Sequence, residues 1–395
     1  MTKTKPTSRR KAPTSSMIAA APIPSLLRSE APAIAGILTT AIFFAFGGTL
    51  LADLENHALT VALFAWLFGT MMWCSFGVAR HAEAVAEKLG EPYGTLVLTL
   101  SVIIIEVALL ASIMLHGENN PTLARDAMFA TLMIVLNGMV GAALLMGALR
   151  YWEQDYNLAG ARAFLVVIAA LAVFALVLPK YTETAPDPSQ SPSKAILFMA
   201  VTLLFYAAFV AIQTLRHRAF FAEPTENHAA GATVPPVEDH TPAVTGSLGF
   251  HITMLLASLL PVVLLSEFLA VIVDFGIEDL GLPDPLGGML IAVLVIAPEG
   301  LTAFNAALAN QLQRAVNVCL GSALATIGLT IPAVLAIGLI TGRDVHLGLT
   351  NVETVLLLLT LFISGLTFGG GRTNVLQGVV HLLLFVVYVV LIFSP

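Results

Sequence analysis

The sequence predicts an all-α polytopic membrane protein with eleven transmembrane helices, arranged as one N-terminal helix followed by two inverted five-helix repeats. Three observations predict this fold. The 395 residues are 57% hydrophobic and only 11% charged, with a mean hydropathy of +0.90. Long apolar runs recur along the chain, and two of them share a motif that ends in Glu. Since soluble domains carry about 25% charged residues, this composition excludes an ordinary cytosolic enzyme.

The predicted spans are runs of mostly apolar residues, because a helix needs about 20 of them to cross a bilayer. Two runs are short, but one ends at Pro179 and the other at the triplet 369–371 of three glycines, and both breakers mark a helix end. We therefore count both as spans. In order, the spans are residues 33–52, 58–79, 94–115, 127–149, 162–178, 195–214, 249–273, 287–309, 317–340, 352–368 and 374–393.

Polar segments divide the chain into five parts. The basic, Pro-rich and Ser-rich residues 1–32 predict a disordered tail. The first apolar run starts too late for a secretory signal and is long enough to span, so we expect it to be retained. The other predicted parts are the first helix (residues 33–57), repeat 1 with helices 2–6 (58–214), a flexible cytoplasmic linker (215–248) and repeat 2 with helices 7–11 (249–395).

Lys and Arg predict the orientation, because both favour the cytoplasmic side of a membrane. We place the N-terminus inside and alternate sides over eleven spans, which puts the C-terminus outside. Four of the 18 basic residues then fall outside and the remaining fourteen inside; the four are Arg125, Lys180, Lys194 and Arg343. One missed or additional span would destroy this bias, so the span count and the orientation support each other.

An internal repeat relates the third and eighth spans. They begin at Gly94 and Gly287, and a Glu follows twelve residues later in each, at Glu106 and Glu299. A Leu-Gly-x-Pro element precedes both spans. Spans 2–6 therefore match spans 7–11. Because the repeating unit has an odd number of spans, the two copies must insert with opposite orientation, as in many secondary transporters.

Helix geometry places the two repeat glutamates at a similar depth. Twelve helical residues rise about 18 Å, and the hydrocarbon core of a bilayer is about 30 Å thick. We therefore expect Glu106, approached from the cytoplasm, and Glu299, approached from outside, to meet near the membrane midplane. A binding site at the midplane between inverted repeats is typical of secondary transporters.

Away from the first two and last two residues of each span, the predicted spans contain three acidic residues, Glu106, Glu267 and Glu299, and no Lys or Arg. A charge at the centre of a spanning helix costs about 2.5–3.5 kcal/mol on insertion scales, so such a Glu is either protonated or bound to a cation. Glu106 and Glu299 are therefore the predicted metal-binding and proton-binding residues of a cation/proton exchanger. Glu267, toward the outer end of its span, is predicted either to line an access path or to reach the interface.

Neutral oxygens near the two glutamates are candidate cation ligands, because hard cations prefer oxygen. Asn137, Ser322 and Thr326 lie in the neighbouring spans 4 and 9, whose small residues also allow close helix packing. Pro298 cannot donate a backbone hydrogen bond, so it frees a carbonyl near Glu299. His251 and His381 also lie in spans, and we expect them to be packed or interfacial rather than ligands.

The stretches around the two glutamates resemble those of the calcium/cation antiporter superfamily, and within it those of the ChaA-type calcium/sodium:proton antiporters. The similar stretches are residues 89–116, Asn137-Gly138, and residues 297–334, with 147–162 and 369–379 in addition. The resemblance implies eleven helices with two inverted five-helix repeats, alternating access, and one essential Glu per repeat, at Glu106 and Glu299. It also implies exchange of Ca²⁺, Na⁺ or K⁺ for H⁺, without a cofactor, across a bacterial inner (cytoplasmic) membrane.

Two positions depart from the wider cation/proton exchanger pattern. Those proteins have Gly-Asn shortly before the first Glu, where this chain has Ile103-Ile104-Ile105. They also have a Gln in the second repeat, where this chain has Ala325. With fewer side-chain amides near the site, calcium and sodium or potassium both remain open as the exchanged cation.

Other classes of function fit the sequence less well. A cation channel needs a continuous pore, usually between symmetric subunits, whereas this chain carries an internal repeat and buried, unpaired Glu. An intramembrane enzyme needs a catalytic set, and neither HExxH nor GxSxG occurs. The net charge of −7 indicates no nucleic-acid partner, and Cys74 and Cys319 form no CxxC metal site. The predicted partners are inorganic cations, protons and the lipid bilayer.

Overall fold

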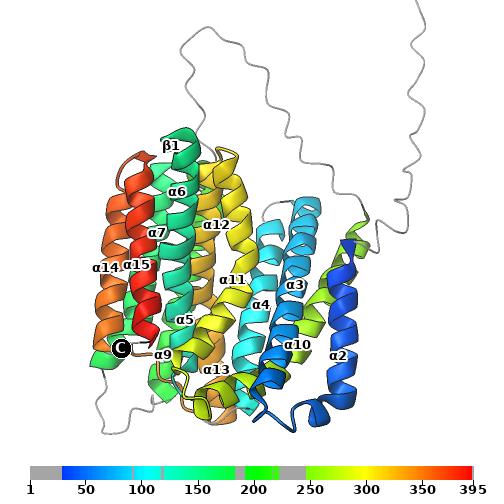
Figure 1. Ribbon diagram of the computed structural model, residues 1–395. Coiled ribbons are helices and arrows are strands. Elements are labelled where there is room, and N and C mark those ends of the chain that lie inside the picture. Colours follow the sequence, from blue (N-terminus) through cyan, green and yellow to red (C-terminus); the bar gives the residue numbers. More distant parts are fainter. Residues whose placement is uncertain are drawn as a thin grey trace, which may run out of the picture.

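A computed structural model describes residues 29–90, 93–116, 120–182, 192–216, 218–221 and 246–393, and these residues are almost entirely helical (Figure 1). Most of the predicted tail 1–32 and of the predicted linker 215–248 lies outside the described residues. The α-helices are α2 (Ala31–Leu50), α3 (His57–Leu89), α4 (Tyr93–His116), α5 (Leu123–Met133), α6 (Val140–Tyr151), α7 (Leu158–Ala172), α8 (Leu178–Tyr181), α9 (Pro192–Ala211), α10 (Leu248–Glu278), α11 (Pro285–Leu308), α12 (Leu312–Ala325), α13 (Ile331–Thr341), α14 (Asn351–Thr367) and α15 (Val375–Phe393).

Short π-helical turns interrupt several of these helices without ending them. The turn η1 (Ile134–Met139) joins α5 to α6, η2 (Val173–Val177) joins α7 to α8, and η5 (Thr326–Thr330) joins α12 to α13. The turn η3 (Ile212–Arg216) follows α9, and a 3₁₀ turn, η4 (Arg218–Phe221), comes after it. Single π-helical turns inside α-helices occur frequently at functional sites.

The predicted fold class is confirmed. Within the described part of the chain, nine helices are long and apolar enough to cross a membrane, and Thr99–Leu115 and Asn351–Thr367 are two shorter apolar helices. These eleven segments correspond to the eleven predicted spans, so the predicted count is compatible with the structure. Successive segments run in alternating directions, and α4 and α11, which carry the repeat motif, run oppositely (Figure 1).

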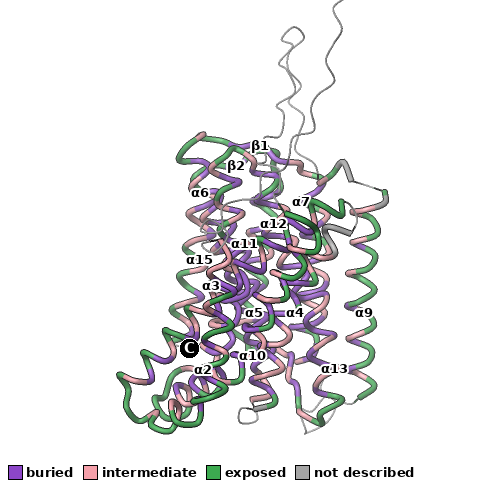
Figure 2. The backbone as a smooth tube through the Cα atoms, turned by 90° about the vertical axis from the view of Figure 1, so that its right-hand side faces the viewer, coloured by how far each residue is buried: buried purple, intermediate pink, exposed green. Residues whose placement is uncertain are grey.

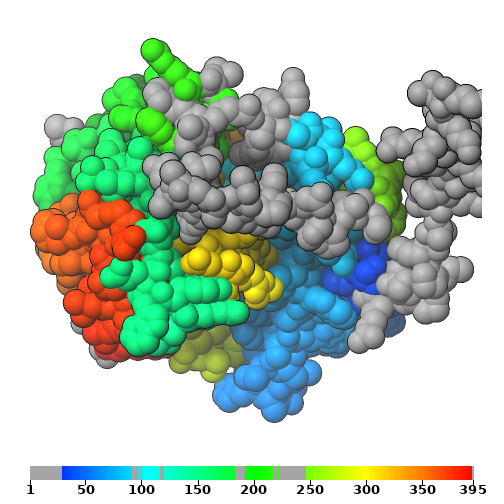
Figure 3. Space-filling model, turned by 90° about the horizontal axis from the view of Figure 1, so that it is seen from above, coloured from blue at the N-terminus to red at the C-terminus, as the bar shows by residue number. Residues whose placement is uncertain are grey.

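The helices form two groups. Helices α2, α3, α4 and α10 contact one another and make up the first helix group, which lies to the right in Figure 1. The second helix group contains the remaining helices, with α11 packed against α5, α6 and α12. Seen from above, α11 lies between the blue helices of the first group and the green-to-red helices of the second (Figure 3). Since α11 also contacts α3 and α4, it joins the two groups.

The buried core of the protein lies along its central helices. Buried residues concentrate on the central helices, whereas α9 stands at the edge and is largely exposed (Figure 2). Two thirds of the most apolar window in the α5–α6 segment is buried, against 22% in α9. Exposed residues such as Phe44, Leu204 and Phe362 are large and apolar, as expected of a surface that faces lipid.

Helices α3 and α10 extend well beyond their predicted spans. They contain 33 and 31 residues, and 33 helical residues reach about 50 Å, more than the about 30 Å of the hydrocarbon core. The predicted span 58–79 stops at Arg80 because the following residues alternate charged and apolar side chains. That alternation ends the hydropathy signal but not the helix, which continues to Gly90 at φ 67°.

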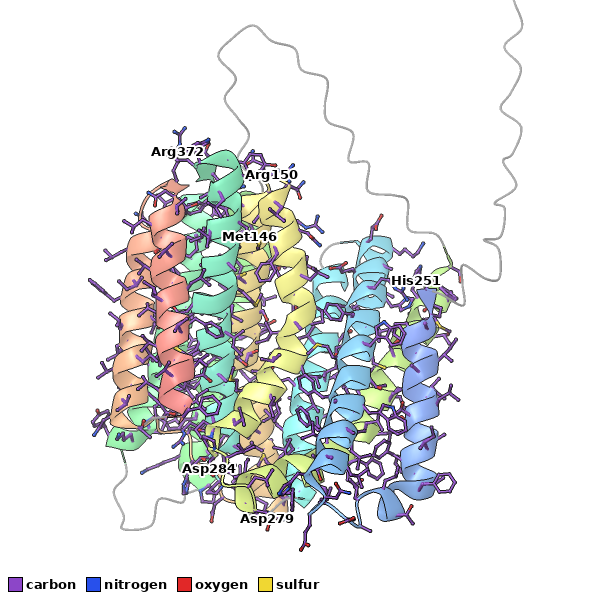
Figure 4. The ribbon with its side chains drawn as sticks, viewed as in Figure 1. Met146, Arg150, His251, Asp279, Asp284 and Arg372 are labelled. Carbon is purple, nitrogen blue, oxygen red and sulfur yellow. The ribbon has the colours of Figure 1, made fainter. Side chains whose placement is uncertain are left out.

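A short strand pair was not predicted from the sequence. β1 (Gln154–Asp155), between α6 and α7, pairs antiparallel with β2 (Arg372–Thr373), between α14 and α15, so that Gln154 lies opposite Thr373. Arg372 Nε donates to Asp155 Oδ1 at 2.8 Å. The pair ties together two loops at the end of the bundle where Arg150 and Arg372 lie, which we call the Arg150 end (Figure 4). Asp279 and Asp284 mark the opposite, Asp284 end.

Glycines allow the closest helix contacts near the repeat motif. A Cβ on Gly288 of α11 would lie 2.5 Å from the backbone nitrogen of Ala127 in α5. A Cβ on Gly378 of α15 would likewise lie 2.6 Å from the backbone nitrogen of Leu145 in α6. Small residues at such crossings let helix backbones approach in a membrane, and the crossing at Gly288 sets the position of the helix that carries Glu299.

Candidate cation-binding site

Glu106 lies at the interface between the two helix groups. It is carried by α4 of the first group and is 1% exposed. Thr326 and Thr330, from the η5 turn of the second group, both donate hydroxyl hydrogen bonds to Glu106 Oε2, each at 3.0 Å. The four-residue spacing of the two threonines places them one turn apart on the same helix face. The buried carboxylate is therefore held by two neutral hydroxyls.

Glu299 is the counterpart of Glu106 in the second repeat. It lies on α11, one residue after Pro298, which is inside that helix. Because Pro298 has no N–H, the carbonyl of Leu294, four residues earlier, lacks its usual helical donor. Glu299 is within electrostatic range of Glu106 and of Glu83. The structure therefore brings the two repeat glutamates into one region.

Both glutamates leave a buried oxygen without a partner. Glu106 Oε1 and Glu299 Oε2 are buried and accept no hydrogen bond. A buried carboxylate oxygen in this condition is costly unless it binds a proton or a cation. In the described residues there is no group of three or more His, Cys, Asp and Glu side chains that could hold a metal ion.

The π-helical turns occupy equivalent positions in the two repeats. Asn137 follows Glu106 by 31 residues (137 − 106), and Thr330 follows Glu299 by the same 31 residues (330 − 299). Asn137 lies in η1 and Thr330 in η5. The turn of the second repeat thus supplies hydroxyls to the glutamate of the first repeat, which is the exchange of contacts expected of inverted repeats that interlock.

Asn137, a predicted ligand, makes different contacts. It is fully buried, but its Nδ2 donates to Thr360 Oγ1 at 2.9 Å, and its Oδ1 lies 3.1 Å from Nδ1 of His381. These partners come from α14 and α15 rather than from the helices that carry the glutamates. The side chain of Asn137 is thus hydrogen-bonded to α14 and α15, which do not carry the glutamates. Its role as a cation ligand stays a prediction.

The remaining predicted site residues lie at different distances from the pair. Thr326 directly contacts Glu106, and Ser322, one helical turn before Thr326 on α12, is partly exposed. Glu267 lies on α10 and is exposed. That Glu267 either lines an access path or reaches the interface stays a prediction.

Two residues near the pair were not identified as site residues from the sequence. Thr330 could have been found from its four-residue spacing to Thr326. Glu83 on α3 lies within interaction range of Glu299 and of Thr302, which is one turn beyond Glu299 on α11 toward the Arg150 end. The three-residue spacing of Glu299 and Thr302 indicates a shared face of α11, but nothing in the sequence shows that α3 would lie opposite this face.

Replacing the two hydroxyl donors should weaken cation binding. A hydrogen bond to a charged group contributes about 1.5–3 kcal/mol, and about 1.4 kcal/mol is tenfold in affinity. We expect Thr326→Val and Thr330→Val each to weaken apparent cation affinity by roughly tenfold or more. Thr202→Val is the control, because this buried hydroxyl bonds only within α9. The check is the cation dependence of exchange in proteoliposomes; affinity unchanged in both variants would contradict this role.

A family model matches most of the chain. The model described as "Sodium/calcium exchanger protein" matches residues 59–215 and 250–394. The two matched segments together contain the glutamate pair and all the transmembrane helices after the first.

Curated relatives extend over nearly the whole chain. A putative ionic transporter, y4hA, of Sinorhizobium fredii is 41% identical over 355 residues, covering 89% of this chain and 94% of the relative. The sodium-potassium/proton antiporter ChaA of Escherichia coli is 34% identical over 365 residues, covering 92% of this chain and 96% of the relative. A Ca²⁺/H⁺ antiporter of Synechocystis is 26% identical over 256 residues, covering 62% and 68%.

Solved structures share the fold. The structure of native YfkE superposes with a TM-score of 0.71 at 18% sequence identity, covering 93% of this chain and all of that chain (100%). The H⁺/Ca²⁺ exchanger CAX has a TM-score of 0.65 at 13% identity, covering 93% of this chain and 89% of that chain. At these identities the likeness supports the polytopic architecture only.

Proposed function

Because this chain belongs to the sodium/calcium exchanger protein family, we propose that it is a secondary antiporter that exports Ca²⁺, Na⁺ or K⁺ in exchange for H⁺. In this proposal Glu106 and Glu299 bind cation and proton in turn by alternating access, and no enzymatic step is involved. The printed names of its relatives include a sodium-potassium/proton antiporter and a Ca²⁺/H⁺ antiporter, which supports exchange of cations for protons and leaves the cation to experiment.

One observation carries the proposal: a buried carboxylate joins the two helix groups without a basic partner. Within the described residues the side chain of Glu106 accepts hydrogen bonds from two threonine hydroxyls at one oxygen, and its second oxygen is unpartnered. An ionised carboxylate in such a site needs a cation, and an un-ionised one needs a proton. Two carboxylates in range of each other can therefore alternate between a bound cation and bound protons as the groups move.

Proton flux in proteoliposomes tests the proposal. Outward-directed gradients of Ca²⁺, Na⁺ and K⁺ are applied in turn, with choline as the control, and internal pH is followed with a trapped dye. We expect at least one of the three cations to drive proton uptake. Cation movement without proton coupling would indicate a channel and contradict the proposal, as would proton flux that no cation drives.

Apparent cation affinity should rise with pH. Protons and cations compete for the same carboxylates, and only the deprotonated form binds a cation, so binding is weakest in acid and strengthens as protons leave. The measurement is the half-saturating cation concentration of exchange between pH 6 and 9. An affinity that stays constant over this range would exclude shared carboxylates.

The orientation is part of the same proposal, in a bacterial inner membrane with the N-terminus in the cytoplasm. Arg150 and Arg372 lie at one end of the bundle (Figure 4), the end predicted to be cytoplasmic from the Lys and Arg bias. We expect a reporter fused after Pro395 to be outside and one inserted near His228 to be inside. Two reporters on the same side would contradict the inverted repeats.

A further inference from the structure

A fully buried histidine links three elements inside the second helix group. His381, on α15, is 0% exposed. Its Nδ1 lies 3.1 Å from Oδ1 of Asn137, in η1, and its Nε2 lies 3.0 Å from Oγ1 of Thr367, on α14. The backbone of α15 comes close to α6, since a Cβ on Gly141 would lie 2.9 Å from the backbone nitrogen of Leu382. The imidazole is thus held in place between η1 and α14.

The partners of Asn137 fix the hydrogen-bond directions around this imidazole. Nδ2 of Asn137 donates to Oγ1 of Thr360 at 2.9 Å. Its Oδ1 therefore faces His381, and an amide oxygen can only accept. It follows that Nδ1 of His381 carries a hydrogen and donates it to Asn137. In a neutral ring Nε2 then has no hydrogen, and it accepts from the hydroxyl of Thr367.

The same imidazole lies beside the backbone of the π-helical turn. The backbone N–H of Val140 bonds to the carbonyls of Val135 and Asn137. In an α-helix this N–H would bond to the carbonyl of Leu136, four residues earlier. The carbonyl of Leu136 lies within interaction range of His381. His381 therefore reaches both a side chain and the backbone of η1.

Repeat symmetry shows how η1 differs from η5. The two threonines of η5 correspond to Met133 and Asn137, because Met133 follows Glu106 by 27 residues (133 − 106), as Thr326 follows Glu299 (326 − 299). The threonines donate to Glu106, whereas Sδ of Met133 lies 3.6 Å from Nδ2 of Asn137. The corresponding pair of the first repeat is thus engaged with α14 and α15. Among the described residues, Oε2 of Glu299 has no hydrogen-bond partner.

The turn η1 nevertheless packs against the helix that carries Glu299. It contacts α11 as well as α15. A Cβ on Gly300, the residue after Glu299, would lie 3.7 Å from Cγ of Met139 in η1. The turn η1 therefore connects His381 to the part of α11 that presents the second carboxylate.

We propose that His381 is a positioning residue of the cation site, which donates its Nδ1–H to Asn137 and thereby fixes η1 against α11 beside Glu299. This inference rests on the proposed function, because it assigns His381 an effect on cation binding. The effect is transmitted through η1, since the hydrogen-bond partners of the imidazole are Asn137 and Thr367. Cation affinity should therefore depend on the donor at Nδ1, while the maximal rate of exchange should change little because both carboxylates remain.

Two substitutions of His381 separate this role from packing. The amide nitrogen of His381→Asn takes the place of Nδ1 and keeps the donor to Asn137, whereas that of His381→Gln takes the place of Nε2. Binding of Ca²⁺, Na⁺ and K⁺ to purified protein is measured by calorimetry, and the maximal rate of exchange in proteoliposomes. We expect His381→Gln to weaken cation affinity by about fivefold, the effect of one uncharged hydrogen bond, and His381→Asn to retain it. Equal affinities in the two variants overturn the proposal.

A matched pair of threonines on α14 tests the same link if a His381 variant fails to fold. Thr360 accepts from Asn137, whereas the buried hydroxyl of Thr354 has no hydrogen-bond partner in the described part of the chain. Thr360→Val should release the amide of Asn137 and weaken cation affinity, and Thr354→Val should bind as the unmodified protein does. Equal affinities of Thr360→Val and Thr354→Val overturn the proposal.

Nitrogen NMR tests the donor direction without any transport assay. Full-length protein in lipid bilayers carries histidine enriched in the heavy nitrogen isotope, and the signals of His381 are those lost in His381→Asn. We expect a hydrogen on Nδ1 and none on Nε2; a hydrogen on Nε2 alone overturns the proposal. If the unmodified protein binds a cation with the expected pattern of affinities but does not exchange it for protons, the proposed exchange is wrong and the role of His381 in cation binding stands.

Discussion

Replacing either glutamate of the pair by Gln should abolish cation/proton exchange. Glu106→Gln and Glu299→Gln keep the shape of the side chain and remove both the charge and the proton site. If the two carboxylates form one site, each change alone should eliminate exchange, with no additive residual activity. We expect both variants to insert normally, because an uncharged amide costs less than a carboxylate at the membrane midplane. The measurement is cation-driven proton flux in proteoliposomes of matched protein content.

Two further variants sharpen this prediction. Glu106→Asp keeps the charge but retracts it by one methylene, away from Thr326 and Thr330, so it should leave weak exchange at best. Glu267→Gln should retain exchange if Glu267, which is exposed on α10, only reaches the interface, and should reduce it if that residue lines an access path. A well-inserted Glu106→Gln protein that exchanges at the unmodified rate would refute the shared site.

Adding a single methyl group at Gly288 should destabilise the protein severely. The Cβ of Gly288→Ala would lie 2.5 Å from the backbone nitrogen of Ala127 and 2.7 Å from the backbone carbon of Asp126. Backbone cannot swing aside as a flexible side chain can, so α11 must shift away from α5. Overpacking of this kind costs about 1–3 kcal/mol, occasionally more. Since α11 carries Glu299, the shift should also displace this carboxylate from Glu106.

Thermal unfolding in detergent and exchange in proteoliposomes measure the two consequences. Gly69→Ala is the control, because the added Cβ has nothing within 4 Å in the middle of α3, where Ala is the better helix former. We expect Gly69→Ala to match or exceed the unmodified melting temperature and Gly288→Ala to fall well below it. Equal melting temperatures for the two variants would show that the contact between α11 and α5 is not as close as described.

Much of the architecture could be predicted because the bilayer imposes it. A spanning helix must satisfy its backbone internally and bury about 20 apolar residues, so spans such as 94–115 and 287–309 match α4 and α11 closely. The glutamate pair was predicted for a related reason: an acidic residue in such a run is costly, and its recurrence at one repeat position indicates function. Thr326 was predicted as a cation ligand because its span neighbours the glutamates; its hydroxyl donates to Glu106, and its role as a ligand stays a prediction.

What could not be predicted depends on contacts between helices distant in the sequence. Beyond its four-residue spacing to Thr326, Thr330 carries no mark that distinguishes it from other threonines until η5 is placed against α4. The role of Asn137 was inferred from its neighbourhood in sequence, but His381 and Thr360 reach it from helices more than 200 residues away. The pairing of Gln154 with Thr373 and the contact of His81 with His251 also join residues that are far apart in the sequence, so neither could be predicted from it. Hydropathy also misses the charged end of α3, because a helix can continue beyond the membrane core.

Proton release on cation binding tests the central claim, that one pair of carboxylates binds cation or proton, most directly. Purified protein in weakly buffered solution receives Ca²⁺, Na⁺ or K⁺, and a pH dye reports the protons set free while bound cation is counted in parallel. We predict that cation binding releases protons from the unmodified protein, and that Glu106→Gln and Glu299→Gln neither bind the cation with comparable affinity nor release protons. Tight cation binding with no proton release, or release that persists in both variants, would contradict the claim.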